Sequence, residues 1–89
     1  MELSDLKERL YEGVTDKLIE DFKEYVSAHP SSDEAYFLLG NAYRRQENWE
    51  DALNSYQNAM DINPDSPAKL AYDAIQEVLA FYNKDMYNQ

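Results

Sequence analysis

The sequence predicts an all-α fold of about five antiparallel helices in one domain that spans residues 1–89. Apolar residues recur at the spacing of a helix, not in the alternation of a strand. The chain has only two Gly and three Pro, which are too few for the turns of a sheet protein of this size. Hydrophobic residues make up 44% of it, which is too much for a disordered segment.

Two helices are expected in the first third of the chain. The first runs from about Ser4 to Glu12 and ends at Gly13, because Gly tolerates the left-handed conformation at a helix C-terminus. Thr15 is the expected N-cap of the second helix, and Pro30 closes it. The apolar face of the second helix follows the helical period and consists of Leu18, Ile19, Phe22, Tyr25 and Val26.

A capping box predicts where the third helix begins. Ser31 is the expected cap, and Glu34, three residues later, completes the box. Arg44 and Arg45 fall in the last turn, where positive charge suits the helix dipole. The residues that share one side of this helix are Tyr36, Leu39, Gly40 and Tyr43.

Two further helices follow. Asn48 is the expected cap of the fourth, from Trp49 to about Ile62. Ser66 as N-cap and Pro67 at the first helical position begin the fifth. We expect the fifth helix to end near Lys84 and residues 85–89 to be frayed. The inner face of the fourth helix is expected to hold Ala52, Leu53, Tyr56, Ala59 and Met60.

The fifth helix carries more apolar residues than one buried side needs. Either it rotates and folds fully onto the domain, or it leaves an apolar patch for a partner or a second copy. Full packing is favoured, because a small core needs every apolar residue. The apolar stripe consists of Ala71, Ala74, Ile75, Val78 and Tyr82, and Leu70, Leu79 and Phe81 widen it.

The chain repeats itself at a period of 34 residues, as the positions of Pro30 and Pro64 show. Residues 33–66 resemble the tetratricopeptide repeat, whose pattern is W-x2-L-G-x2-Y, then A-x3-F, a small residue and Pro. The departures are tyrosines in place of the first Trp and of the Phe, and both keep the aromatic bulk. The matched places are Tyr36, Leu39, Gly40, Tyr43, Ala52, Tyr56, Ala59 and Pro64.

The resemblance implies a right-handed array of helical hairpins with one full repeat at 33–66. Residues 1–32 keep only the second half of the pattern and are interpreted as a degenerate repeat. Residues 67–89 are interpreted as a capping helix, in which Asp73 and Glu77 replace an apolar pair of the pattern.

The family binds an extended or helical peptide in a concave groove, so the resemblance implies a protein or peptide partner. Phe37 would supply apolar area, Asn41 backbone hydrogen bonds and Arg45 charge. A clamp for a C-terminal carboxylate is disfavoured, because Phe37 stands where such family members have Lys. The groove-facing places are Glu34, Phe37, Asn41, Arg44 and Arg45 in the full repeat, Ala71, Ile75, Val78 and Tyr82 in the last helix, and Leu3, Lys7 and Leu10 in the first.

Composition argues against several other classes of function. The net charge of −10 would repel phosphate, so no nucleic acid partner is expected. The absence of Cys excludes disulfides and thiol chemistry. The polar N-terminus lacks the apolar core of a signal peptide, and no apolar run is long enough to span a membrane. We therefore expect a cytoplasmic protein without a membrane partner.

Catalytic motifs are missing from the sequence. His29 is the only His, and there is no paired His spacing for a metal, no glycine-rich phosphate loop and no nucleophile elbow. We therefore expect no enzyme, no cofactor and no metal. The prediction is a protein-binding module or scaffold. The alternative is a small structural subunit that forms a homodimer, or docks onto a larger complex, through its C-terminal helix.

Overall fold

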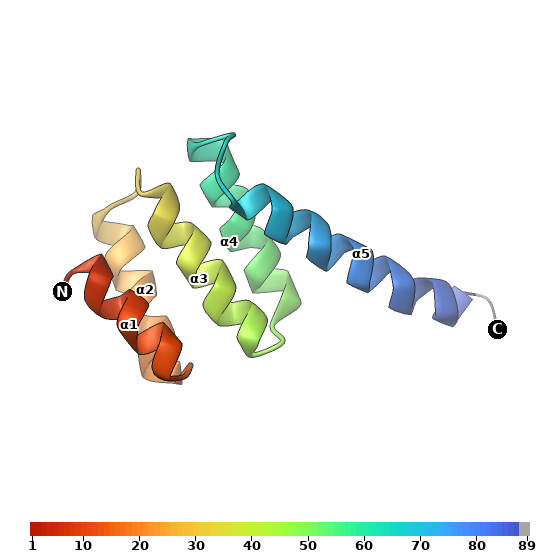
Figure 1. The fold of residues 1–89 in the computed structure, drawn as a ribbon, viewed down its shortest axis with the longest axis horizontal. Helices are drawn as coiled ribbons and strands as arrows, with labels where there is room; N and C mark the ends of the chain where they lie inside the picture. The colour runs from red at the N-terminus through yellow and green to blue at the C-terminus, as the bar shows by residue number, and fades with distance from the viewer. Residues whose placement is uncertain (88–89) are drawn as a thin grey trace.

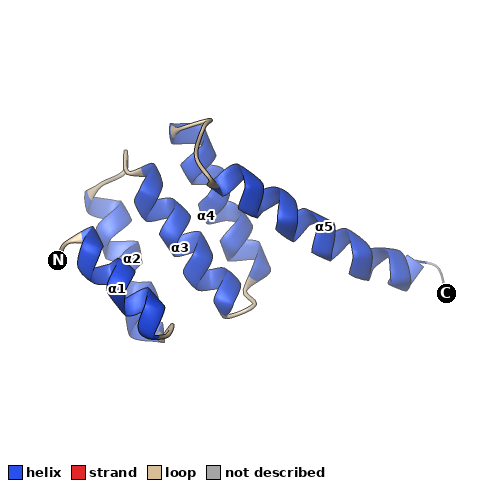
Figure 2. Ribbon diagram, in the orientation of Figure 1, coloured by secondary structure: helices blue, strands red, loops and turns tan. Residues whose placement is uncertain are grey.

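The computed structural model describes the backbone of residues 1–87 and the side chains of residues 1–81. Within this part of the chain there are five helices and no strand (Figure 2), which confirms the predicted all-α fold. The helices are α1 (Leu3–Glu12), α2 (Asp16–Ala28), α3 (Asp33–Arg45), α4 (Trp49–Ile62) and α5 (Ala68–Tyr87).

The helices form two hairpins followed by one longer helix (Figure 1). The first hairpin, α1 and α2, packs against α3, and α3 forms the second hairpin with α4. Helix α5 packs along α4, and its second half extends beyond the other four helices. Because each hairpin contacts mainly its neighbour in sequence, the architecture is that of a short helical array.

The hydrophobic core consists of two clusters. One is built from α1, α2 and α3 around Leu6, Leu18 and Phe22, and the other from α4 and α5 around Tyr56 and Ile75. The two clusters are joined through α3, because three of its partly buried aromatic residues pack against both. These are Tyr36, Phe37 and Tyr43.

The cap of α2 is the predicted residue, but the cap of α3 is not. Thr15 Oγ1 accepts a hydrogen bond of 3.1 Å from the backbone N–H of Leu18, as predicted. The cap of α3 is Ser32 and not Ser31, since Ser32 Oγ accepts from the N–H of Ala35 at 3.2 Å. A capping side chain accepts from the N–H two or three residues later, and in a capping box the third residue must return a bond. For Ser32 that residue is an alanine, which cannot return the bond, so the predicted capping box is absent.

The remaining helix ends also differ in detail from the predictions. The side chain of Asn48 donates to Asp51 at 2.8 Å and makes no bond to the helix backbone. Ser66 Oγ accepts from the N–H of Ala68 at 3.1 Å, and Pro67 lies just before the helix instead of at its first position. Gly13 ends α1 with φ 147° and ψ 155°. This is the extended region open to Gly at positive φ, and not the predicted left-handed helical one.

Helix α5 departs most from the predictions. It continues to Tyr87, past the expected end at Lys84, and residues 88 and 89 lie outside the described part. The expectation that α5 packs fully onto the domain is wrong: Leu70 is 77% exposed, Val78 43% and Phe81 63%. Since α5 lies against α4, only one of its sides can be buried.

No helix in the described part of the chain has both the length and the apolar character needed to cross a membrane.

Candidate functional site

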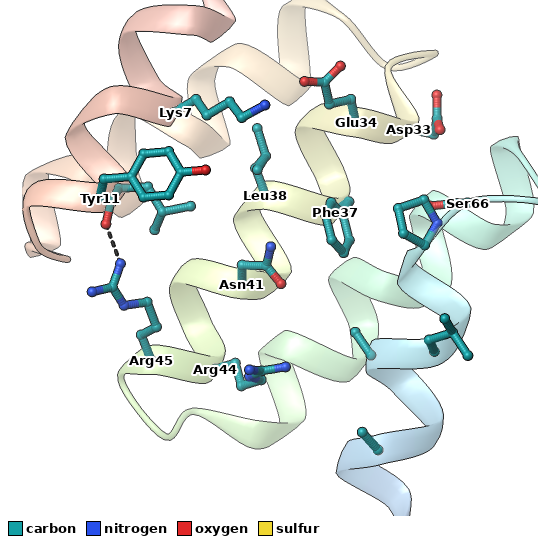
Figure 3. A pocket seen from close by; sticks show the side chains of 15 residues that line it. Lys7, Tyr11, Asp33, Glu34, Phe37, Leu38, Asn41, Arg44, Arg45 and Ser66 are labelled. Carbon is teal, nitrogen blue, oxygen red and sulfur yellow. Dashed lines mark hydrogen bonds between the residues drawn. The ribbon is translucent and has the colours of Figure 1, made fainter.

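A groove of about 940 Å³ lies between α1, α3 and α5 (Figure 3). Helix α3 forms its floor with Glu34, Phe37, Leu38 and Asn41, and α1 forms one wall. The opposite wall is the start of α5 and the turn before it. The residues of that wall are Ser66, Pro67, Leu70, Ala71 and Ala74.

Most of the residues predicted to face a groove do line this one. They are Lys7 and Leu10 of α1, Glu34, Phe37, Asn41, Arg44 and Arg45 of α3, and Ala71 of α5. Leu3, Ile75 and Val78 do not line it, and the side chain of Tyr82 lies outside the described residues. Ile75 is only 2% exposed and packs in the core against α4, so it is not accessible to a partner.

The error on α5 has a physical cause. Counting forward by the 34-residue period places Asp73 and Glu77 against α4, where burying their carboxylates would be costly. In the structure α5 is rotated, so that Ile75 is buried while Asp73 and Glu77 are exposed. The same rotation turns Leu70 and Ala74 toward the groove. The signal that could have revealed this was the pair of carboxylates itself.

Tyr56 links the core to the floor of the groove. Its side chain is fully buried between α3 and α4, and its hydroxyl donates to Asn41 Oδ1 at 2.5 Å. Burial raises the pKa of the Tyr56 phenol, and a hydrogen bond and the charge of the nearby Arg44 offset part of the rise. The polar end of a core residue therefore meets two of the predicted partner-binding residues. The sequence pattern indicates Tyr56 only as aromatic bulk on the inner face of α4.

Close packing beneath the groove depends on Gly40. A Cβ at this position would lie 2.5 Å from Cε1 and 2.6 Å from Cδ1 of Tyr56. The Tyr56 ring also contacts Phe37, with ring centroids 6.0 Å apart and planes inclined at 40°. The absent side chain at residue 40 thus lets Tyr56 reach far enough under α3 for its hydroxyl to meet Asn41.

Arg45 makes a contact inside the protein. One of its guanidinium nitrogens donates to the backbone carbonyl of Leu10, near the C-terminal end of α1 (Figure 3). This bond joins α3 to α1 across the groove wall, and it also satisfies a carbonyl that the helix end leaves without a partner. Arg45 therefore has a structural role that the sequence analysis did not foresee.

Charge is unevenly distributed along the groove. Asp33 and Glu34 lie at the end where α3 begins, and Arg44 and Arg45 at the end where it finishes. Asp33 accepts a hydrogen bond of 3.0 Å from the side chain of Asn63. With Lys7, the lining carries three cations and two carboxylates, so the groove is slightly positive on a chain whose net charge is −10.

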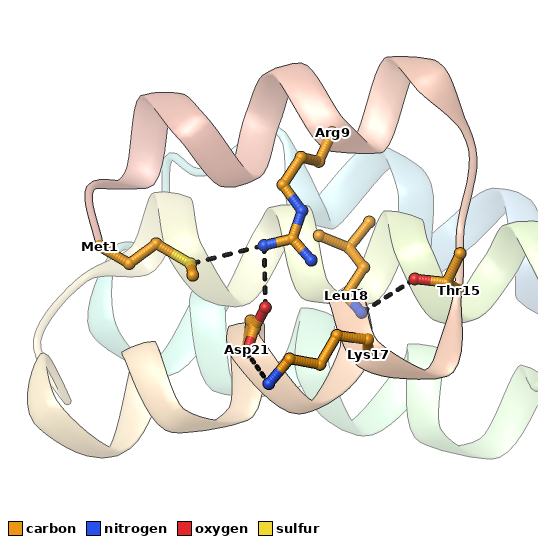
Figure 4. Close-up of polar contacts among 6 residues, drawn as sticks. All are labelled: Met1, Arg9, Thr15, Lys17, Leu18 and Asp21. Atoms are coloured by element: carbon orange, nitrogen blue, oxygen red, sulfur yellow. Dashed lines mark hydrogen bonds and ion pairs between the residues drawn. The ribbon is translucent and has the colours of Figure 1, made fainter.

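A second polar cluster lies between α1 and α2, outside the groove (Figure 4). The carboxylate of Asp21 is 2.8 Å from Arg9 and 3.1 Å from Lys17, and its side chain is almost fully buried. The hydrogen bond from Arg9, followed by that from Lys17, holds the pKa of Asp21 below its ordinary value of 3.8. Because both cations are occupied by Asp21, the cluster joins the first hairpin and offers no open site.

In the described part of the chain, no group of three or more His, Asp or Glu side chains is placed to hold a metal ion. The groove lining combines apolar side chains with guanidinium, ammonium, amide and carboxylate groups. Such a surface suits the binding of a peptide by apolar contact and hydrogen bonds.

Comparisons with known proteins match this geometry. A model of the tetratricopeptide repeat family matches residues 33–66. The chain is 45% identical to protein BF1650 of Bacteroides fragilis, known from a solution NMR structure, with a TM-score of 0.83. That similarity covers 99% of this chain and 90% of the other. Among curated proteins no match was found. The segment 33–66 includes α3 and α4, and so supplies the floor of the groove together with Tyr56.

Proposed function

Because the chain belongs to the tetratricopeptide repeat family, we propose that it is a protein–protein interaction module that binds a peptide segment of a partner in the groove between α1, α3 and α5. The observation that carries this proposal is the groove itself, about 940 Å³ with Phe37 and Leu38 on its floor. Repeats of this family generally mediate protein–protein interaction. The proposed role is binding without catalysis, and it suits a cytoplasmic chain, since a protein without Cys needs no oxidising compartment.

The test compares the wild type with one groove variant and one matched control. Arg44→Glu places a carboxylate in the groove, while Lys23→Glu makes the same charge change on α2, away from the groove lining. Both residues are exposed, so both variants should keep the helix content of the wild type by circular dichroism.

Each protein is then used as bait for a lysate of the native cell. We expect the partner to be retained by the wild type and by Lys23→Glu, and lost by Arg44→Glu. Equal retention by all three proteins would contradict binding in the groove. A partner lost by both variants would indicate recognition by overall charge instead.

A second candidate function is self-association through α5. It is favoured by the exposure of Leu70, Val78 and Phe81 on that helix, since monomers rarely leave several large apolar side chains exposed together. Sedimentation equilibrium over a wide range of concentration tests it. A mass that rises with concentration in the wild type and stays monomeric in Val78→Glu would support a homodimer. A monomer at every concentration would exclude it.

A further inference from the structure

We propose that the groove selects its partner by an acidic side chain, held between Asn41 and Arg44, next to a large apolar residue that packs on Phe37. The inference rests on the proposed function, because it names the ligand of the same groove. Three observations carry it: the hydroxyl of Tyr56, the hydrogen-bonding capacity left on Asn41 and Arg44, and the apolar residues beside them.

The hydroxyl of Tyr56 reaches the groove from the core, where it forms a hydrogen bond with Asn41 on the groove floor. Phenylalanine has the same ring and would fill the same space between α3 and α4. The added oxygen donates to Asn41 Oδ1 at 2.5 Å, and it lies close enough to Arg44 for that cation to lower the pKa of the phenol. From its buried position Tyr56 therefore fixes the orientation of Asn41 in the groove, with Arg44 nearby.

The groups left to a ligand at this point are donors. The carbonyl oxygen of Asn41 already accepts from Tyr56, so the free capacity of this side chain is mainly its amide N–H groups. Arg44 forms no ion pair with any described carboxylate. The two residues are three apart on one helix and so lie on the same face. Their spare groups are therefore mainly donors, and a carboxylate, which only accepts, is their chemical complement.

Apolar side chains of the groove lie beside Asn41 and Arg44. Phe37 lies one turn before Asn41 on the groove floor (Figure 3), and Leu70 and Ala74 of α5 line the same groove. Leu70 is 77% exposed, so a ligand side chain placed between it and Phe37 would remove apolar surface from water. The ligand is thus a segment with Asp or Glu close to a large apolar residue.

The carboxylate is assigned to a side chain and not to a chain terminus. A second free cation beside Arg44 would be needed to grip a terminal carboxylate firmly. The neighbouring Arg45 is already bound to the carbonyl of Leu10, and Lys7 lies on the side of Glu34, away from Arg44 (Figure 3). The groove also continues past the donor pair, over Phe37, to Glu34 at the other end of its floor. A continuous segment can occupy that length and present one acidic side chain to Arg44.

The experiment uses a random library of immobilised nonapeptides, acetylated at the N-terminus and amidated at the C-terminus, so that side chains supply the only carboxylates. The wild type is expected to enrich peptides with Asp or Glu near Leu, Ile, Met or an aromatic residue. The best peptide is then compared with its analogue in which the acid is replaced by the amide. We expect the analogue to bind about tenfold more weakly, the usual effect of one charge-assisted hydrogen-bonded pair.

Two variants connect this preference to the residues named. Tyr56→Phe keeps the core filled and removes only the hydroxyl, and it should reduce the preference for acid over amide. Arg44→Gln should abolish that preference. Lys23→Gln, which removes a cation outside the groove lining, should leave it unchanged. Melting temperatures measured on all four proteins show that each is folded when it is assayed.

The outcomes separate the two proposals. Enriched peptides without an acidic residue would overturn this inference and leave groove binding intact. A preference for acid over amide that survives in Arg44→Gln would also overturn the inference. So would tighter binding of peptides in which a free C-terminal carboxylate replaces the acidic side chain. If the library yields no enriched peptide at all, both this inference and the proposed function fall together.

Discussion

Gly40 shows how one residue sets the distance between two helices. We expect Gly40→Ala to destabilise the protein, although alanine favours a helix by about 1 kcal/mol over glycine. The added Cβ would lie 2.5 Å from the ring of the fully buried Tyr56. Overpacking of this kind usually costs about 1–3 kcal/mol, so the net loss should be about 1 kcal/mol.

Urea unfolding followed by circular dichroism measures this loss. Ser27→Ala, at an exposed position of α2, serves as the control for a substitution to alanine without a new contact. A Gly40→Ala protein that is more stable than the wild type would show that Tyr56 moves aside freely, and that Gly40 does not limit the approach of α3 to α4.

Asp21 should make the stability of the protein depend on pH. Its folded-state pKa is lowered, chiefly by the hydrogen bond from Arg9 and then by that from Lys17. A lowered pKa contributes stability that is present above the unfolded value of 3.8 and lost as the pH falls through the folded value. Asp21→Asn should therefore weaken the protein near neutral pH and much less at about pH 2.

The measurement is urea unfolding of both proteins at the two pH values. Asp21→Asn leaves every other carboxylate in place, so the difference in stability between the two proteins isolates Asp21. A difference in the free energy of unfolding that is the same at both pH values would show that the charge of Asp21 adds no stability through Arg9 and Lys17.

At the scale of the element, Arg45 should be needed to hold α1 in place. Its guanidinium donates to the carbonyl of Leu10 and so ties α1 to α3, whereas Leu6 and Leu10 in the core and the ion pair of Arg9 with Asp21 hold α1 elsewhere. We expect Arg45→Ala to cost about 1 kcal/mol, the value of a partly exposed charged hydrogen bond. Hydrogen exchange should accelerate in α1 more than in α4.

Arg44→Ala is the matched control, because it removes the same side chain one residue away and leaves the bond to Leu10 intact. Equal exchange of α1 in both variants would contradict the structural role. The result also matters for binding studies, since a partner lost on mutation of Arg45 could be lost through displacement of α1.

The five helices could be predicted from apolar spacing and breakers, because burial of one face and the conformational limits of Gly and Pro are local properties. The exact caps could not be predicted. Ser31 and Ser32 are neighbouring residues of the same type, and only the structure shows that the backbone N–H of Ala35 binds Ser32. The groove face of α3 was found by resemblance to the repeat. The face that α5 presents to the groove could not be predicted in this way. It depends on the rotation of α5, which is set by burial of Ile75 against α4 and exposure of Asp73 to solvent.

At the scale of the whole molecule, charge opposes folding. The chain carries a net charge of −10 in a body of 49 × 28 × 18 Å. The ion pairs among the described residues involve only two carboxylates, those of Asp21 and Asp73. At about 10 mM salt the screening length is about 30 Å, so most like charges repel one another across the body, whereas at about 1 M it falls to about 3 Å.

We therefore expect the melting temperature at pH 7 to rise as NaCl is added, because screening weakens the repulsion more than it weakens the three local ion pairs. Thermal melts by circular dichroism over this range of salt measure the effect. The control is the same series near pH 4.3, the isoelectric point of the chain, where net repulsion is gone and the rise should shrink. A fall in melting temperature with salt at pH 7 would mean that attraction, led by the buried carboxylate of Asp21, outweighs the repulsion of the acidic surface. An equal rise at both pH values would point to an effect of salt on apolar burial instead of charge.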